Sequence, residues 1–177
     1  MSHFILISGS PSDHSRSDVV LRYLGQQLPG EVTHVSVRDI PAADLCEARF
    51  DSLPIQRLQT LIKQADGVVI ASPVYKAAYS GVLKALLDLL PPDAFQNKPV
   101  LPLMTGGSAN HLLALDYSFK PLLSALKANT LKGVYLVDHH IDKKNQDAPV
   151  TDPALLERLH QQTKQFIAAV ELKKVLL

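Results

Sequence analysis

The chain of 177 residues is poor in residue types whose scarcity narrows its function. It has one cysteine, Cys46, and no tryptophan. A single thiol excludes an internal disulfide, a zinc site built from thiolates and a cysteine-held iron–sulfur cluster. We therefore expect a reducing compartment, the cytoplasm.

An excess of charge of either sign is also missing. Lys and Arg number 18 against 17 Asp and Glu, which gives a formal net charge of +1. This balance provides no basic field for nucleic acid and no acidic excess of the kind expected on an electron carrier that docks on basic partners. No apolar run has membrane-spanning length, and the N-terminus lacks the features of a signal peptide. We expect a soluble enzyme for small molecules, with no nucleic-acid and no membrane partner.

What the chain does contain is a regular alternation of apolar strands and amphipathic helices. The pattern predicts strands over 4–7, 32–37, 67–72, 100–104 and 130–137, helices over 16–28, 54–64, 81–90, 111–127 and 153–173, and a long loop over 40–54. Such alternation is typical of a parallel sheet with right-handed crossovers. We predict one α/β domain over 1–177, a doubly wound five-stranded parallel sheet of order 2-1-3-4-5 with helices on both faces.

The loop Ser8 to Ser17, after the first strand, favours phosphate binding. It supplies several hydroxyls, free N–H groups, the start of a helix and the cation Arg16. The lysine of a P-loop and the glycine pattern of a dinucleotide fingerprint are both absent, so a mononucleotide, FMN, fits better. The alternative is a plain strand-to-helix turn whose serines only cap the helix.

Two further loops follow strands that end at the same edge of the predicted sheet, Pro73 to Gly81 and Thr105 to His111. Pro73 fixes the backbone so that Val74 and Tyr75 can face a flat ring. Gly106 and Gly107 let the main chain approach that ring, and their N–H groups suit the flavin pyrimidine end. No catalytic acid or base is expected, because hydride transfer between nicotinamide and flavin belongs to the two cofactors.

These loops carry a resemblance to a known family. The strings are Gly9-Ser10-Pro11, Ser15-Arg16-Ser17, Ser72 to Leu90 with its Tyr-Lys-Ala-Ala-Tyr-Ser-Gly run, and Thr105-Gly106-Gly107. They resemble the flavodoxin-like NAD(P)H-dependent FMN reductases, and within these most the reductase of two-component alkanesulfonate monooxygenase systems. The similarity extends to about Val137, whereas His139 to Val150 matches nothing.

The resemblance implies FMN and NADPH as cofactors, a flavodoxin-like fold, and reduced FMN passed to a partner monooxygenase. It assigns Ser10, Ser15, Arg16 and Ser17 to the FMN phosphate, Pro73, Val74, Tyr75 and Lys76 to the loop beside the isoalloxazine, and Thr105, Gly106 and Gly107 to its pyrimidine end. Two alternatives remain: an FMN-retaining reductase of quinones, azo compounds or metal oxyanions, and a flavodoxin-type electron carrier, which the near-neutral charge disfavours.

Three other positions have an ordinary interpretation beside a functional one. His111 either faces flavin or nicotinamide or is a partly exposed polar residue at a helix start. Lys76 either meets a phosphate of the nicotinamide nucleotide or is solvated. The pair His139-His140 is expected in a solvated loop rather than at a metal, because adjacent strand residues point to opposite sides.

The segment His111 to Lys127 is apolar on more than one helical face. Such a helix is normally buried on both faces, which predicts a homodimer or homotetramer. Pro121 should distort the turn near Tyr117, either as a simple kink or as a π-bulge. The resemblance favours the π-bulge and places Tyr117 at an oligomer interface.

Overall fold

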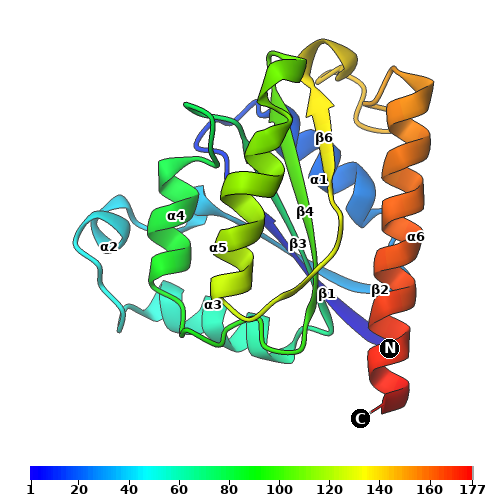
Figure 1. Cartoon of the computed structure of the whole chain (residues 1–177). Coiled ribbons are helices and arrows are strands. Elements are labelled where there is room, and N and C mark those ends of the chain that lie inside the picture. Colours follow the sequence, from blue (N-terminus) through cyan, green and yellow to red (C-terminus); the bar gives the residue numbers. More distant parts are fainter. Residues whose placement is uncertain (177) are drawn as a thin grey trace.

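The structure, a computed structural model, describes residues 1–176 and centres on one parallel sheet (Figure 1). Its strands are β1 (Ser2–Ser8), β2 (Gly30–Ser36), β3 (Gly67–Pro73), β4 (Pro99–Gly106), β5 (Asn129–Thr130) and β6 (Val134–Val137). They follow the order β2-β1-β3-β4-β5, and β6 pairs with β4 beyond β5. The predicted doubly wound order is therefore confirmed.

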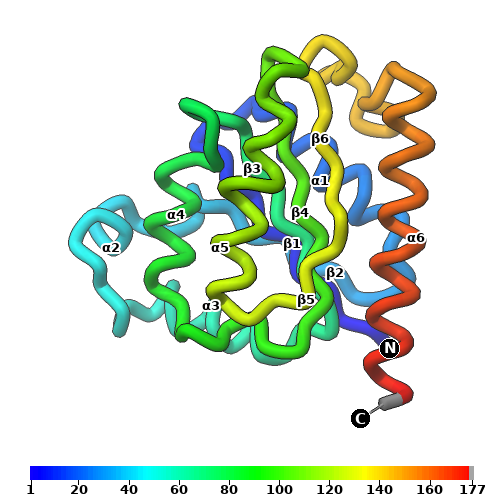
Figure 2. The backbone as a smooth tube through the Cα atoms, in the orientation of Figure 1, coloured from blue at the N-terminus to red at the C-terminus, as the bar shows by residue number. Residues whose placement is uncertain are grey.

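Helices cover both faces of this sheet, as the tube in Figure 2 also shows. They are α1 (Arg16–Gly25), α2 (Ala42–Cys46), α3 (Leu53–Gln64), α4 (Gly81–Asp88), α5 (Lys120–Ala125) and α6 (Pro153–Leu176). One apolar cluster lies between the sheet and α3, α4 and α5, and a second lies between the sheet and α1 and α6. Among the described residues, no helix is both long and apolar enough to cross a bilayer.

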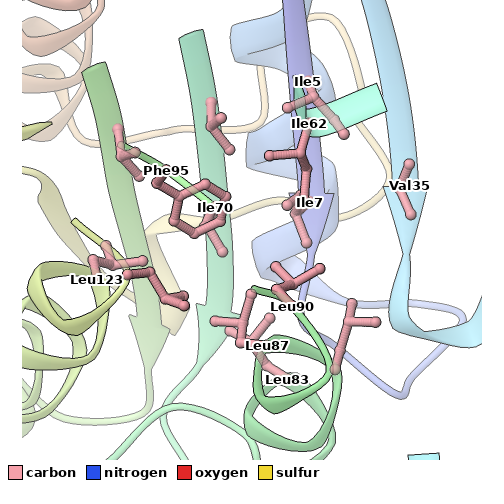
Figure 3. Packing of buried hydrophobic residues seen from close by; sticks show 14 of the residues in the cluster. Ile5, Ile7, Val35, Ile62, Ile70, Leu83, Leu87, Leu90, Phe95 and Leu123 are labelled. Atoms are coloured by element: carbon pink, nitrogen blue, oxygen red, sulfur yellow. The ribbon is translucent and has the colours of Figure 1, made fainter. Parts of the chain in front are cut away.

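The two clusters follow from the alternation of side chains along each buried strand. On β1, Ile5 and Ile7 enter the cluster of α3, α4 and α5, and Phe4 and Leu6 enter the cluster of α1 and α6. Figure 3 shows Ile5, Ile7 and Ile70 packed with Leu87 and other helix residues on the first of these faces. The middle of the sheet is thus closed on both sides, which leaves only its strand ends for a ligand.

The predicted fifth strand over 130–137 is wrong in one respect, because two short strands take its place. Val100 pairs with Thr130, and Leu103 pairs with Val134. A step of three residues along β4 therefore matches a step of four residues along the edge chain. The extra residue forms a bulge at Gly133, whose φ is +78°. The carbonyl of Val100 accepts a hydrogen bond from the N–H of Leu131 on the edge chain. Backbone groups two residues apart in a strand point to the same side, so Pro102 also faces the edge chain, but it has no N–H to donate.

The loop predicted over 40–54 and the helix predicted over 111–127 also need correction. The loop contains α2. The predicted helix is divided into a 3₁₀ turn (Ala109–His111), a π-helix (Leu115–Phe119) and α5. The N–H of Lys120 donates to the carbonyl of Leu115, five residues back, just ahead of Pro121. The π-bulge predicted near Tyr117 is confirmed.

Candidate functional site

Hydrogen bonds tie the three predicted loops together at the carboxyl edge of the sheet. The hydroxyl of Ser80, which caps the N-terminus of α4, donates to the carbonyl of Gly9 at 2.5 Å. The N–H of Gly9 donates to the carbonyl of Ala71 at 2.7 Å. The N–H of Val74 donates to the carbonyl of Thr105, also at 2.7 Å. The loops after β1, β3 and β4 are therefore held as one unit, although they are far apart in sequence.

A cavity of about 260 Å³, the carboxyl-edge pocket, opens between these loops. Its lining includes most of the predicted site residues: Ser10, Ser15, Arg16, Pro73, Val74, Tyr75, Thr105, Gly106 and Gly107. Residues from three separate loops thus meet around one space, as the rule for open α/β sheets predicts.

Three predicted site residues do not line this pocket. Ser17 is fully buried, and its hydroxyl lies 2.7 Å from that of Ser15. Lys76 is exposed at the tip of a tight turn, where it and Ala77 have φ of +50° and +65°. His111 is exposed in the 3₁₀ turn after β4. The turn at Lys76 instead presents Tyr75, whose N–H donates to the carbonyl of Ala78 at 2.9 Å.

The end of the pocket at α1, which we predict to bind the phosphate, has one unsatisfied donor. The Nε atom of Arg16 is buried and has no hydrogen-bond partner among the described residues. Arg16 begins α1, and the hydroxyl of the capping residue Ser15 accepts from the N–H of Asp18 at 3.3 Å. An unpaired buried guanidinium N–H is costly, and a helix N-terminus carries partial positive charge. These groups fit an anion such as the FMN phosphate.

One carboxylate, that of Asp18, lies in the same first turn of α1. Burial opposes its ionisation, but hydrogen bonds with His34 at 2.9 Å and from Arg22 at 2.8 Å outweigh burial and hold the pKa of Asp18 below its usual range. The charge of Asp18 is thus engaged on the outer side of α1. The Asp18 carboxylate therefore repels an anion bound at Arg16 less than an unpaired carboxylate would.

The end of the pocket that we predict to face the flavin ring is shaped by two glycines with different surroundings. A Cβ atom on Gly106 would come within 3.3 Å of the ring carbon that bears the Tyr135 hydroxyl, and closer still to the hydroxyl itself. A Cβ atom on Gly107 would meet only the Asp138 carboxylate, at 4.0 Å. The space over Gly107 is therefore open to a ligand, and Gly106 is needed for the packing beneath it.

Tyr135, on β6, fixes this glycine loop from below. Its hydroxyl donates to the carbonyl of Ser108 at 2.6 Å, and burial, with a smaller effect of the Asp138 charge, raises its pKa. The hydroxyl therefore keeps its proton and acts as a donor. Sequence reasoning missed Tyr135, because a tyrosine in an apolar strand shows no sign of a polar partner.

Sequence reasoning also missed four residues that line the pocket: Ser12, His14, Asp138 and Lys143. Asp138 and Lys143 follow β6, at and just beyond the point where the sequence motifs end. The rule that ligands sit beyond the carboxyl ends of strands, applied to the fifth strand as to the others, would have pointed to Asp138.

Comparisons with known proteins agree with this geometry. A family model described as NADPH-dependent FMN reductase matches residues 3–142. The chain is 48% identical over 171 residues to an FMN reductase (NADPH) of Pseudomonas putida, covering 94% of this chain and 87% of that protein. It is 45% identical over 175 residues to an FMN reductase (NADPH) of Escherichia coli K12, covering 97% and 91%.

A solved NADH:FMN oxidoreductase has the same fold, with a TM-score of 0.82 and 29% identity over 96% of this chain and 90% of that one. Family match, sequence identity and fold therefore agree. The chain belongs to the NADPH-dependent FMN reductase family, and it is an oxidoreductase whose cofactors are FMN and NADPH.

Proposed function

We propose that the protein reduces FMN with NADPH and releases the reduced flavin to a flavin-dependent monooxygenase of sulfonate or sulfur assimilation. The observation that carries the proposal is the uneven burial of the carboxyl-edge pocket. Ser10 and Ser15 are buried, whereas Tyr75 is 46% exposed and Gly107 is exposed. A flavin anchored mainly by its phosphate, with an open ring end, suits repeated exchange better than permanent retention.

In this proposal the phosphate end provides most of the affinity. Arg16 donates from its free Nε and adds a positive charge, and the uncharged hydroxyls of Ser10 and Ser15 add further hydrogen bonds to the phosphate. Ser17 holds the Ser15 hydroxyl in place. A guanidinium adds Coulomb attraction to the phosphate that an uncharged hydroxyl lacks, so the loss of Arg16 should weaken binding more than the loss of either serine hydroxyl.

The ring end orients the flavin. Pro73, Val74 and Tyr75 pack beside the isoalloxazine, while Thr105, Gly106 and Gly107 place backbone groups at its pyrimidine edge. Bound FMN supplies the redox chemistry by accepting a hydride from NADPH. The side chains of the pocket exclude water and set the ring geometry, and none acts as an acid or base. Lys76 and His111, outside the pocket, are free to contact the incoming nucleotide.

The test combines turnover with flavin retention. Purified protein is assayed for NADPH oxidation at increasing FMN and then passed over a gel-filtration column after loading with FMN. We expect oxidation that saturates with added FMN, and colourless protein after the column. A yellow protein that reduces quinones or azo dyes without added FMN contradicts the release of flavin, and absence of steady NADPH oxidation contradicts the enzyme.

We also propose that Tyr117 lies at an interface between copies of the chain, in a homodimer or homotetramer. On the π-helix and the turn before it, Leu113 is 58% and Tyr117 is 78% exposed, whereas Leu115 and Phe119 are buried. Light scattering of native protein and of Tyr117→Ala tests this. Tyr117→Ala should loosen the assembly, and Phe50→Ala, which removes a 58% exposed ring elsewhere, should leave it intact. A native monomer at micromolar concentration contradicts the interface.

A further inference from the structure

Among the described residues that line the carboxyl-edge pocket, Asp138 is the one acid. It follows the last residue of β6, Val137, which pairs with Gly106 on β4, so the register places Asp138 beside Gly107 (Figure 1). A Cβ atom on Gly107 would lie 4.0 Å from a carboxylate oxygen of Asp138. This carboxylate therefore borders the open space that we assign to the flavin ring.

The Asp138 carboxylate has no cation beside it. Asp138 is half-buried, and it forms no ion pair with any residue in the described range 1–176. The hydroxyl of Tyr135 donates to the carbonyl of Ser108 instead, and burial, with a smaller effect of the Asp138 charge, raises the pKa of Tyr135. The negative charge of Asp138 thus acts on the glycine end of the pocket without an ion pair to neutralise it.

The basic side chains of the pocket lie at its opposite end. Arg16 begins α1, and His14 and Lys143 also line a neighbouring cavity against α1, of whose lining Asp138 is not part. The pocket is therefore basic where we place the FMN phosphate and acidic beside the glycine loop. This separation of charge sets different conditions for the two ends of one flavin.

Reduction changes the charge at one end of the flavin only. Hydride transfer from NADPH leaves NADP⁺ and converts FMN to FMNH⁻, and the added negative charge rests on the pyrimidine end of the ring system. The phosphate is the same in both states. A fixed carboxylate beside the pyrimidine end therefore disfavours the reduced flavin and affects the oxidised flavin much less.

We infer that Asp138 weakens the binding of reduced FMN relative to oxidised FMN, and thereby promotes the exchange of product for substrate. This inference rests on the proposed function, because it requires the flavin ring to lie beside Gly107. It deepens the proposed function by naming the residue that makes the reduced flavin the weaker ligand.

The test compares the affinities for the two states of the flavin. Dissociation constants for oxidised FMN and, under anaerobic conditions, for dithionite-reduced FMN are measured by equilibrium dialysis in wild type and three variants. Asp138→Asn keeps the size of the side chain and removes its charge, whereas Asp138→Glu keeps the charge. Asp142→Asn is the matched control, because Asp142 is exposed in the same segment and does not line the pocket.

We expect the ratio of the dissociation constants, reduced over oxidised, to fall about tenfold in Asp138→Asn and to stay near the wild-type value in Asp138→Glu and Asp142→Asn. The ratio cancels any effect on the phosphate, which both states share. As an independent readout, the midpoint potential of the bound flavin should rise by about 30 mV in Asp138→Asn, which is the tenfold change converted for a two-electron couple.

Two results overturn the inference. One is an unchanged ratio in Asp138→Asn. The other is an equal shift in Asp142→Asn, because the effect would then come from the net charge of the protein rather than from the place of Asp138. A rise of the KM for NADPH in Asp138→Asn with an unchanged flavin ratio belongs to the first result, and it would assign Asp138 to the nicotinamide nucleotide.

Failure of the proposed flavin site gives a different result. Wild-type protein that binds neither oxidised nor reduced FMN contradicts the site and, with it, the inference. Wild-type protein that binds FMN and oxidises NADPH, with the same flavin ratio as Asp138→Asn, overturns the role of Asp138 alone.

Discussion

The two edges of the sheet hold cavities that differ in size and in the state of their polar groups. The amino-edge pocket, between the end of α3 and the start of β4, has a volume of about 610 Å³, against about 260 Å³ for the carboxyl-edge pocket. Its most buried cation, Lys98, donates to the carbonyls of Ala65 at 2.7 Å and Lys63 at 3.2 Å. At the carboxyl edge the Nε of Arg16 has no such partner.

In the proposed site, the unsatisfied donor of Arg16 rather than cavity size is the feature that points to an anionic ligand, whereas the buried hydroxyls of Ser52 and Thr130, which also lack partners among the described residues, line neither pocket. Lys98 donates to carbonyls at the C-terminal end of α3, so its ammonium group has little remaining capacity to bind a ligand. Burial lowers the pKa of Lys98, which is a consequence of that same structural position. Arg16 lacks an internal task, and its buried N–H costs free energy until an anion accepts from it.

Exchanging the two cations for neutral residues gives the largest expected effect. Arg16→Ala should weaken FMN by about ten- to a hundredfold and leave riboflavin, which has no phosphate, unchanged, because a charge-assisted contact contributes about 1.5 to 3 kcal/mol. Lys98→Met should lower the melting temperature and leave both flavin affinities unchanged. Fluorescence titration checks the affinities. Equal weakening of FMN and riboflavin binding in Arg16→Ala would contradict the contrast between Arg16 and Lys98.

The next effect separates the two glycines at the carboxyl edge. Gly106→Ala should destabilise the fold by about 1 to 3 kcal/mol, because the new methyl group collides with the Tyr135 side chain. Gly107→Ala should leave the unfolding free energy nearly unchanged and weaken both FMN and riboflavin. Urea unfolding and flavin titration of both variants check this. Equal loss of stability in the two variants would contradict the open space assigned to Gly107.

A smaller effect is expected from the hydroxyl that supports the glycine loop. Tyr135→Phe removes the bond to the Ser108 carbonyl and should weaken FMN and riboflavin alike by about three- to tenfold, in line with a hydrogen bond worth about 1 kcal/mol. Tyr23→Phe is the matched control, because its hydroxyl lies 3.0 Å from His160, away from the site. A fall in FMN affinity alone would place Tyr135 at the phosphate instead.

The smallest effect is the contribution of the Asp18 carboxylate to the pH dependence of folding stability. Because the folded-state pKa of Asp18 lies below its ordinary 3.8, its contribution to stability is complete above that value and is lost as pH falls below it. Asp18→Asn should therefore be less stable than wild type by on the order of 1 kcal/mol at pH 6, with the gap starting to narrow only as pH falls below 3.8. Chemical unfolding at several pH values measures the gap. A constant gap would contradict the low pKa.

The regular part of the fold was predictable because its signals are local. Apolar runs marked β1, β3 and β4, and Pro121 marked a distorted turn, which the family resemblance identified as a π-bulge. The bulge at Gly133 was not predictable, because it depends on Pro102 in a neighbouring strand that only the fold brings beside it. The short helix α2 was missed because it is held by its surroundings rather than by a strong pattern of its own.

The candidate site also contains residues with a local sequence signal and residues whose place depends on the fold. Ser10, Ser15, Arg16, Gly106 and Gly107 stand in loops that follow strand ends, so their position together with the family resemblance predicted them as site residues. Ser17, Lys76 and His111 stand in the same loops but point elsewhere, and backbone conformation, such as the positive φ of Lys76, decides that. Tyr135 and Lys143 come from segments whose relation to the site exists only in three dimensions.

The most direct measurement of the central claim observes the unpaired donor itself. The NMR signal of the Arg16 side-chain Nε–H, assigned by its absence in Arg16→Ala, is followed while FMN or riboflavin is added to saturation. We predict that FMN shifts this signal and slows its exchange with water, and that riboflavin leaves it in place. A signal unmoved by saturating FMN, or moved equally by both flavins, would contradict the assignment of Arg16 to the flavin phosphate.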